Sequence, residues 1–554
     1  MNNPILTIEH LSVTFNHQQR VVNNISFDIQ AGETFALVGE SGSGKSMTAL
    51  SVLRLSPNNA ALTAKSINLQ GDNLVNRSEF DLCKIRGKRI GIIFQDPMSS
   101  LNPVMTIGSQ IEEVIKLHFE LSGSAVKQQA LALLQQVEIP EPQLRYKDYP
   151  HQLSGGQRQR VMIAIALAGK PDLLIADEPT TSLDVTIQAQ ILLLLKNIQQ
   201  QTGMALWLIS HDLALVSSIA DRVAVMQHGK IVETNLTSEL FNQPQHLYTR
   251  KLLNALPSMQ SCVKRKPTIL QAHDLYLCRL QARTEKRLNR PPLLHVSDFY
   301  CHYPIRKGLF KRVVDVVRAV DGVSFDIQHG KTLALVGESG CGKTTLGKSL
   351  LNLIPGTGLV VIDGVELTSL TGEALRQQRA NIQIIFQDPF SSMNPRMLVG
   401  DIIAEGLRAL QPTINAEERK DRVLKLLQQV DLPEDSALRY PHEFSGGQRQ
   451  RICIARALAV EPKLIVCDEP TSALDVSVQA QIIKLLKTLQ DEQGLSYLFI
   501  THDLAVVSEI ADDVAVMYRG KIVEYGSVTE VLTQPKEAYT RKLLAAVPVL
   551  KKEG

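Results

Sequence analysis

Two glycine-rich segments of the chain have the composition of a phosphate-binding loop, or P-loop. Both fit the pattern G-x-x-x-x-G-K-S/T, in which glycines let backbone N–H groups curve around an anion at the start of a helix. Lys45 and Lys343 are predicted to reach the β- and γ-phosphates of a nucleotide, and Ser46 and Thr344 to bind Mg²⁺. The predicted phosphate-binding residues are Gly39, Glu40, Ser41, Gly42, Ser43, Gly44, Lys45 and Ser46, and Gly337, Glu338, Ser339, Gly340, Cys341, Gly342, Lys343 and Thr344.

An acidic pair follows an apolar run in each half of the chain, as Asp177-Glu178 and Asp468-Glu469. Because a hard cation prefers oxygen ligands, a carboxylate at the end of a buried strand can hold Mg²⁺, directly or through water. Asp177 and Asp468 are therefore predicted metal ligands. Their neighbours Glu178 and Glu469 are predicted general bases that act on an attacking water.

The motifs occur twice in the same order, which indicates an internal repeat. Residues 1–257 and 293–554 are predicted to be two copies of one domain, joined by a polar, basic linker at 258–292. The register between the copies is constant at 291 positions for the pairs Ser154 and Ser445, Asp177 and Asp468, and His211 and His502.

The composition is that of an ordinary globular protein, with 44% hydrophobic and 21% charged residues and a net charge of only +3, and nothing in it indicates nucleic-acid binding. The longest apolar runs are far shorter than the roughly 20 residues that cross a bilayer. No basic stretch leads into an apolar segment at the N-terminus, so we expect no secretory signal and a cytosolic chain. The seven cysteines are too scattered for a disulfide framework.

The elements that must position these motifs alternate between strands and helices. Alternating apolar residues near the N-terminus indicate a half-exposed strand, and continuous apolar runs indicate strands buried on both faces. This order predicts an α/β fold with a mostly parallel sheet and a ligand at the carboxyl ends of its strands. The predicted buried strands are 35–38, 173–176 and 206–209 with their counterparts 333–336, 464–467 and 497–500, and the predicted helical segments are 107–137 and 398–430.

Leu153–Gln157 and Phe444–Gln448 resemble the LSGGQ signature of the ABC ATPases. This resemblance implies tandem P-loop NTPase domains, each with a mostly parallel sheet core, an antiparallel β subdomain and a helical subdomain. In that family the signature loop closes over the γ-phosphate of a nucleotide held by the opposite domain. Phe444 replaces the usual leucine at a position that we expect to pack rather than touch phosphate. The implied nucleotide-binding residues are Ser154, Gly155, Gly156 and Gln157, and Ser445, Gly446, Gly447 and Gln448.

The resemblance assigns the remaining site residues and the cofactors, ATP and Mg²⁺. Gln95 and Gln387 correspond to lid-loop glutamines that contact Mg²⁺ and water, and residues 182–184 and 472–475 to the D-loops. His211 and His502 correspond to switch histidines at the γ-phosphate, which makes the implied catalytic residues Glu178, Glu469 and these two histidines. For the aromatic that stacks on adenine, the candidates are Phe15 in the first copy and either Tyr303 or Phe310 in the second.

The resemblance also implies two composite sites within one chain, which would close on itself as a pseudo-symmetric dimer. Neither site lacks its acid or its histidine, so both are predicted to hydrolyse ATP. Site one would combine Lys45, Ser46, Gln95, Asp177, Glu178 and His211 with Ser445 and Gly447, and site two Lys343, Thr344, Gln387, Asp468, Glu469 and His502 with Ser154 and Gly156.

The lid loops at 94–103 and 386–395 and the closing segments at 248–253 and 539–544 resemble those of the oligopeptide/dipeptide/nickel importer ATPases. Fused members of that group import peptides and the peptide–nucleotide antibiotic microcin C. The resemblance implies a peripheral subunit on the cytoplasmic face of the bacterial inner membrane. Its partners would be two transmembrane permease subunits and, through them, a periplasmic solute-binding protein, without nucleic acid.

Two other classes of protein fit the sequence less well. A soluble twin ABC ATPase that acts on ribosomes or DNA is disfavoured, because the linker at 258–292 is short and bears prolines and because no zinc-like cysteine array is present. An exporter motor is disfavoured by the closing segments, which resemble those of the importers.

Overall fold

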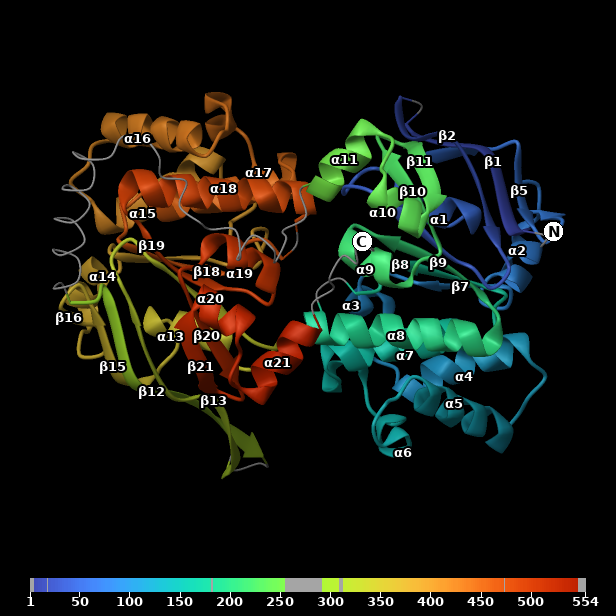
Figure 1. Ribbon diagram of the computed structural model, residues 1–554, viewed down its shortest axis with the longest axis horizontal. Coiled ribbons are helices and arrows are strands. Elements are labelled where there is room, and N and C mark those ends of the chain that lie inside the picture. The colour runs from blue at the N-terminus through green and yellow to red at the C-terminus, as the bar shows by residue number, and fades with distance from the viewer. Residues whose placement is uncertain are drawn as a thin grey trace. The chain divides into compact units, whose positions relative to one another are not determined.

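Two compact units make up the protein in a computed structural model (Figure 1). The first unit contains the elements from β1 to α11, and the second contains the bulk of those from β12 to α21. Most of the predicted linker lies outside the described residues, as do Ser182, Ala473 and Phe310. The described residues are 4–16, 18–180, 183–254, 291–307, 312–472 and 474–546.

The first unit begins with a five-stranded antiparallel sheet in the order β2-β1-β5-β6, with β4 also paired to β1. Leu11 and Val13 on β1 are buried, as the alternating pattern predicts for the inner face of a half-exposed sheet. The strands are β1 (Pro4–Phe15), β2 (Gln19–Gln30), β4 (Ala60–Thr63), β5 (Ser66–Leu69) and β6 (Asp72–Asn73).

A six-stranded sheet in the order β11-β10-β3-β9-β8-β7 forms the core of the first unit. All of its neighbours are parallel except the edge strand β11, which is antiparallel to β10. The carboxyl ends of β3, β8 and β9 therefore meet at one edge of the sheet, which is where the motifs begin. The strands are β3 (Thr34–Val38), β7 (Ile90–Ile93), β8 (Leu173–Asp177), β9 (Ala205–Ser210), β10 (Arg222–Gln227) and β11 (Lys230–Leu236).

The helices of the first unit include a group, α3 to α7, that is inserted between β7 and β8 and forms the predicted helical subdomain. The predicted helical segment at 107–137 is two helices, α4 and α5, separated by a short turn. The helices are α1 (Lys45–Val52), α2 (Glu79–Ile85), α3 (Pro97–Ser100), α4 (Ile107–His118), α5 (Ser124–Gln136), α6 (Pro142–Arg145), α7 (Gly155–Leu167), α8 (Val185–Thr202), α9 (Leu213–Ile219), α10 (Thr237–Asn242) and α11 (Leu247–Asn254), with a 3₁₀ turn at Pro150–Gln152.

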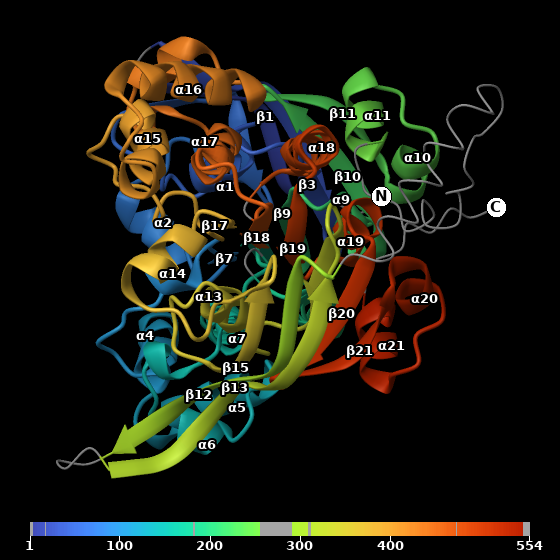
Figure 2. The ribbon, with the colours of Figure 1, turned by 90° about the vertical axis from the view of Figure 1, so that its left-hand side faces the viewer.

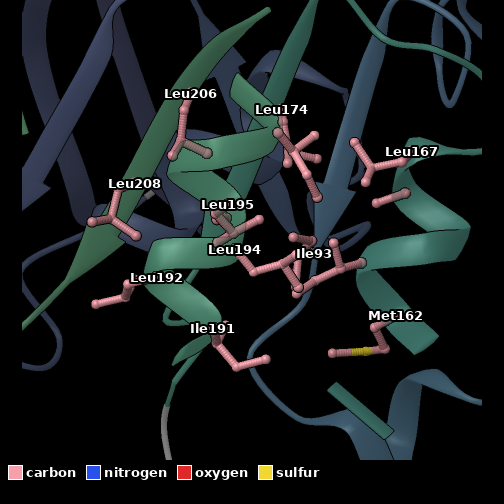
Figure 3. Close-up of a cluster of buried hydrophobic side chains, with 14 of the residues drawn as sticks. Ile93, Met162, Leu167, Leu174, Ile191, Leu192, Leu194, Leu195, Leu206 and Leu208 are labelled. Carbon is pink, nitrogen blue, oxygen red and sulfur yellow. The ribbon is translucent and has the colours of Figure 1, made fainter. Parts of the chain in front are cut away.

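Both faces of the parallel sheet are covered, which explains why its strands are continuous apolar runs. On β8, Leu174 belongs to a cluster that includes α4, α5, α7 and α8, whereas Leu173 and Ile175 belong to a cluster shared with α1 and the antiparallel sheet. Figure 3 shows the first of these clusters, in which side chains of α7 and α8 pack against those of β7, β8 and β9. The strand ends are thus held from both sides.

The second unit repeats this architecture, with an antiparallel sheet in the order β13-β12-β15-β16 and a parallel core in the order β17-β18-β19-β14-β20-β21. Here β21 is the antiparallel edge strand. The pair β12 and β13 forms a longer ribbon than its counterpart and extends from the sheet (Figure 2). The strands are β12 (Leu294–Lys307), β13 (Arg312–Ile327), β14 (Thr332–Val336), β15 (Thr357–Ile362), β16 (Val365–Glu366), β17 (Ile382–Ile385), β18 (Leu464–Asp468), β19 (Ser496–Ile500), β20 (Asp513–Tyr518) and β21 (Lys521–Ser527).

The helices of the second unit follow the same order, and the predicted segment at 398–430 is again two helices, α15 and α16. No helix among the described residues of either unit is long and apolar enough to cross a membrane. The helices are α13 (Lys343–Leu350), α14 (Gly372–Gln378), α15 (Val399–Leu410), α16 (Ala416–Gln429), α17 (Gly446–Leu458), α18 (Val476–Gln493), α19 (Leu504–Ile510), α20 (Val528–Thr533) and α21 (Ala538–Ala545), with 3₁₀ turns at Glu434–Leu438 and Pro441–Glu443.

Candidate nucleotide-binding and hydrolysis sites

Each predicted P-loop connects a central strand to the helix that follows, from β3 to α1 and from β14 to α13. The last glycine of each loop has a left-handed backbone, with φ of 106° at Gly44 and 113° at Gly342. A Cβ atom on Gly44 would lie 2.7 Å from the carbonyl oxygen of Val21, and one on Gly342 would lie 1.9 Å from that of Ala319. Glycine is required here because the loop turns tightly against a neighbouring strand.

The P-loop lysine lies inside its own loop. Nζ of Lys45 donates to the carbonyl oxygens of Gly39 at 2.8 Å and Glu40 at 2.9 Å, and the side chain is buried. Burial lowers the pKa of Lys45, while the charge of Glu178 opposes this shift. An ammonium held by two carbonyls at the mouth of the loop can exchange them for phosphate oxygens.

The second P-loop has the same arrangement. Nζ of Lys343 donates to the carbonyl oxygens of Gly337 at 2.7 Å and Glu338 at 2.9 Å. Both lysines therefore have the same local geometry, with each bonded to the carbonyl oxygens of the first two residues of its loop.

The predicted Mg²⁺ ligands meet at the start of the P-loop helix. Oγ of Ser46 donates to Oδ1 of Asp177 at 2.9 Å, and Oγ1 of Thr344 donates to Oδ1 of Asp468 at 2.8 Å. Each aspartate is the last residue of its strand and is almost completely buried. Burial raises the pKa of Asp177 to about 6 and also raises the pKa of Asp468. A buried carboxylate of this kind is stabilised when a cation binds beside it.

These residues fit Mg²⁺. Hydroxyl and carboxylate oxygens are its preferred ligands, and Mg²⁺ usually takes one or two from protein and the rest from water and phosphate. Among the described residues no group of three or more histidine, cysteine, aspartate or glutamate side chains could hold a metal ion by itself.

The predicted general base of the first unit is held by three other residues. Glu178 has a left-handed backbone, with φ of 47°, and its N–H donates to the carbonyl oxygen of Ile209 at 2.9 Å. Nε2 of Gln95 donates to Oε2 of Glu178 at 2.9 Å, and Nδ1 of His211 lies 3.3 Å from Oε1. A left-handed glutamate persists only where its surroundings hold it, and such residues concentrate at functional sites.

The second unit holds its general base in the same way. Glu469 has φ of 47°, its Oε2 accepts from Nε2 of Gln387 at 2.9 Å, and its Oε1 lies 3.4 Å from Nδ1 of His502. Burial would raise the pKa of Glu469, but the hydrogen bond and charge of His502, the charge of Lys343 and the hydrogen bond from Gln387 together leave the pKa below its ordinary value. The carboxylate is therefore ionised at neutral pH, as a base must be.

The contact between His211 and Glu178 also affects the pKa of the histidine. Burial lowers the pKa of His211, but the hydrogen bond to Glu178 and the negative charges of Glu178 and other nearby carboxylates together leave the pKa above its ordinary value. The histidine donates a hydrogen bond to the Glu178 carboxylate. This bond can hold the carboxylate in place while the carboxylate receives a proton from water.

The signature residues form the first turn of α7 and of α17. Oγ of Ser154 accepts from the N–H of Gln157 at 3.3 Å, while Oε1 of Gln157 accepts from the N–H of Ser154 at 3.0 Å, which is a capping box. Ser445 and Gln448 form the same box. Because the serine oxygen acts only as an acceptor in this box, its O–H group can still donate a hydrogen bond to an anion.

The second glycine of each signature is required by close packing. A Cβ atom on Gly156 would lie 2.9 Å from Cγ2 of Ile187 on α8, and one on Gly447 would lie 2.4 Å from Cγ1 of Val478 on α18. Phe444, which replaces the usual leucine, is buried. The signature glycines therefore set how closely the signature helix approaches the next long helix.

A serine-to-alanine change in the signature separates helix capping from function. Ser154→Ala should cost about 1 kcal/mol of unfolding free energy and reduce ATP hydrolysis about ten-fold, because both the cap and the outward donor are lost. Ser527 caps α20 in an identical box away from the motifs, so Ser527→Ala is the matched control. Thermal unfolding and phosphate release measure the two effects. Equal hydrolysis in the two variants would contradict a role beyond capping.

The candidate adenine-stacking aromatics occupy equivalent positions in the two antiparallel sheets. Val13 pairs with Val22 on β2, and Cys301 pairs with Val320 at the equivalent position of β13. Phe15 follows Val13 by two residues, and Tyr303 follows Cys301 by two residues. Burial raises the pKa of Tyr303, and a hydrogen bond to Thr345 beside the P-loop opposes this shift. Phe310, the other candidate, lies outside the described residues.

Each unit thus brings together a P-loop lysine, a hydroxyl beside a buried aspartate, and a glutamate held by glutamine and histidine. This combination is chemically suited to hold a nucleoside triphosphate with its cation and to activate a water. The fold and these sites define an ABC-type ATPase. The family model described as "ABC transporter" matches residues 22–181 and 320–472, so the chain belongs to the ABC transporter family.

A second model, described as "Oligopeptide/dipeptide transporter, C-terminal region", matches residues 232–285 and 523–554. The peptidoglycan transport ATP-binding protein YejF of Agrobacterium fabrum is 48% identical over 548 residues, which is 98% of this chain and 96% of that protein. An uncharacterized ABC transporter ATP-binding protein YejF of Escherichia coli is 48% identical over 98% of this chain and 100% of its own length. The glutathione import ATP-binding protein GsiA of Salmonella paratyphi A is 47% identical over 98% of this chain and 90% of its own length.

Proposed function

We propose that this ABC ATPase powers the uptake of peptides or peptide-like compounds across a bacterial inner membrane. The observation that carries the proposal is the match of both halves to the oligopeptide/dipeptide transporter C-terminal region, directly after a complete set of hydrolysis motifs. Its place would be the cytoplasmic face of that membrane. Its partners would be two transmembrane permease subunits and, through them, a periplasmic solute-binding protein.

The hydrolysis step follows from the geometry within each unit. The N–H groups of the P-loop and Lys45 bind the phosphates, while Ser46 and Asp177 would hold Mg²⁺. The ion would supply positive charge that stabilises the phosphates during transfer. Glu178 accepts a proton from the attacking water, and its contacts with Gln95 and His211 hold the carboxylate in one orientation.

The proposal includes two composite sites, each made of the P-loop of one half and the signature of the other. It is supported by the family resemblance and by the complete set of motifs in both halves. Binding of ATP would close the halves as a pseudo-symmetric dimer, and hydrolysis with phosphate release would part them. Both sites would hydrolyse ATP, because neither lacks its glutamate or its histidine.

The cargo class is inferred from the relatives, which are named for peptidoglycan transport and glutathione import. Glutathione is a tripeptide and peptidoglycan contains short peptides, so small peptides are the chemistry that they share. Microcin C, a peptide–nucleotide, falls in the same class. The permeases and the solute-binding protein would select among such compounds, since the ATPase supplies only the motion.

Affinity purification from membranes tests the assembly. The tagged chain should co-purify with two multi-span permease subunits, whereas co-purifying ribosomes or DNA would contradict transport.

Deletion of the gene should abolish growth on defined short peptides and confer resistance to microcin C if that compound is a cargo. Export of a peptide from cells by the intact system would favour an exporter instead.

Removal of the cation tests the role of the buried aspartates. Chelation with EDTA should abolish ATP hydrolysis, because Asp177 and Asp468 would then face the phosphates without a cation. Added Mg²⁺ should restore full turnover, whereas added Na⁺ at equal ionic strength should not. Phosphate release that continues undiminished in EDTA would contradict the metal assignment.

A further inference from the structure

The helix that closes each unit touches the P-loop through a tyrosine hydroxyl. Tyr248 on α11 accepts a hydrogen bond from the backbone N–H of Glu40 at 3.3 Å, and Tyr539 on α21 accepts one from the N–H of Glu338 at 3.0 Å. Each glutamate is the second residue of its P-loop. The contact occurs independently in both units at equivalent positions.

The bonded peptide group is also the one that positions the P-loop lysine. The carbonyl oxygen of Glu40 accepts from Nζ of Lys45, while its N–H donates to Tyr248. The carbonyl oxygen of Glu338 accepts from Lys343 in the same way. The second P-loop residue is therefore held at both of its backbone polar groups, one by the lysine and the other by the tyrosine.

A carboxylate on the edge strand fixes the start of the closing helix in each unit. In the first unit, Glu233 on β11 accepts from the N–H groups of Gln245 at 2.8 Å and His246 at 3.0 Å. Burial would raise the pKa of Glu233, but these bonds and its other hydrogen bonds leave the pKa below its ordinary value. The carboxylate stays ionised and anchors the turn that leads into the helix.

The second unit has the same anchor. Glu524 on β21 accepts from the N–H groups of Lys536 at 2.8 Å and Glu537 at 3.2 Å. The tyrosine rings are also packed. Tyr248 is only 7% exposed, and the ring centroids of Tyr539 and Tyr518 are 4.2 Å apart. Each hydroxyl is thus held at the P-loop by the protein's own structure and does not depend on a ligand.

We propose that Tyr248 and Tyr539 are positioning residues that brace the P-loop, so that the closing helix of each unit sets the affinity of its site for ATP. This inference rests on the proposed nucleotide binding and deepens it. The anchors and tyrosines all lie within the segments matched by the oligopeptide/dipeptide transporter C-terminal region, 232–285 and 523–554. The proposal gives that region a role in the nucleotide site.

The brace should act on binding and leave the chemical step unchanged. Without the hydroxyl, the N–H of Glu40 loses its acceptor and the peptide can leave the geometry that holds Lys45. Nucleotide binding must then order the loop again, which lowers affinity by about five-fold for the loss of one hydrogen bond. Both tyrosine hydroxyls act on the backbone of the second P-loop residue, so kcat should be unchanged.

A binding titration on the full chain isolates each site. In a Lys343→Ala background, Tyr248→Phe should raise the Kd for a fluorescent, non-hydrolysable ATP analogue about five-fold. Tyr146→Phe is the matched control in this unit, because the Tyr146 hydroxyl donates to Glu112 in the helical subdomain. The control should leave the Kd unchanged.

The Kd of the second site for the ATP analogue is measured in a Lys45→Ala background. Tyr539→Phe should raise the Kd by a similar factor, and Tyr497→Phe should not, because the Tyr497 hydroxyl donates to the carbonyl oxygen of Leu486 at 2.9 Å in the core. In the otherwise unchanged chain, Tyr248→Phe with Tyr539→Phe should raise KM for ATP about five-fold at constant kcat.

The outcomes separate the inference from the function on which it rests. An unchanged Kd in both tyrosine variants, or an equal rise in the core-tyrosine controls, would overturn the brace. A loss of kcat at saturating ATP would also overturn it, because it would show a role in the chemical step. Failure of the unmodified chain to bind the analogue would overturn the proposed function itself.

Discussion

The chain with both Glu178→Gln and Glu469→Gln should hydrolyse ATP about 100- to 10 000-fold more slowly than the unmodified chain, because a general base contributes a factor of that size. Glutamine keeps the shape of the side chain but cannot accept a proton from water. The hydrogen bonds from Gln95 and Gln387 can still reach the remaining carbonyl oxygen. ATP should therefore bind normally, and steady-state phosphate release measures the loss.

The single variant Glu178→Gln should lower turnover and leave ATP bound, which a filter-binding assay detects as retained nucleotide. Glu79→Gln is a suitable control, because Glu79 forms an exposed ion pair with Arg86 on the same unit. Its change should leave turnover intact. Undiminished steady-state activity in Glu178→Gln would refute the assignment of the general base.

Replacing both P-loop lysines by alanine should weaken ATP binding about 100-fold, because one charge-assisted hydrogen bond to phosphate contributes up to about 3 kcal/mol. Both lysines are buried inside their loops. Equilibrium titration with a fluorescent ATP analogue measures the effect. Each single variant, Lys45→Ala or Lys343→Ala, should reduce the number of nucleotides bound per chain from two to one.

Exposed lysines provide the controls for this experiment. Lys84→Ala in the first unit and Lys463→Ala in the second remove surface ion pairs with Asp81 and Asp363. Surface pairs of this kind contribute little to stability, and these two are not part of a P-loop. A binding stoichiometry of two that persists in Lys45→Ala would contradict independent phosphate binding by the first P-loop.

Much of the fold was predictable because its signals are local. Buried strands of a parallel sheet are continuous apolar runs, and the runs before the P-loops and before Asp177 and Asp468 are β3, β14, β8 and β18. The helical subdomain was located correctly, but each predicted segment is two helices. The break in the first segment was missed because Ser122 and Gly123, which precede α5, lie within a largely helical pattern.

The roles of the tyrosines were not predictable in the same way. Tyr248 and Tyr539 stood out only as members of a repeated closing segment, and the repetition of that segment in both copies was the available signal. Their hydroxyls contact residues that lie far away in the chain. Nothing in the spacing of the closing segment indicates which backbone group its tyrosine will meet.

The amino-acid sequence by itself determined the repeat, the α/β class and the residues of each hydrolysis motif, because P-loops, acidic strand ends and signature turns depend on residues that are neighbours in the chain. Only the tertiary structure decided that Glu178 meets Gln95 and His211, that the glutamate backbone is left-handed, and that a closing-helix tyrosine bonds to the P-loop. Such contacts join elements that are far apart in sequence. They form because burial of apolar surface packs those elements together, and local patterns in one sequence do not reveal which elements will pack against each other.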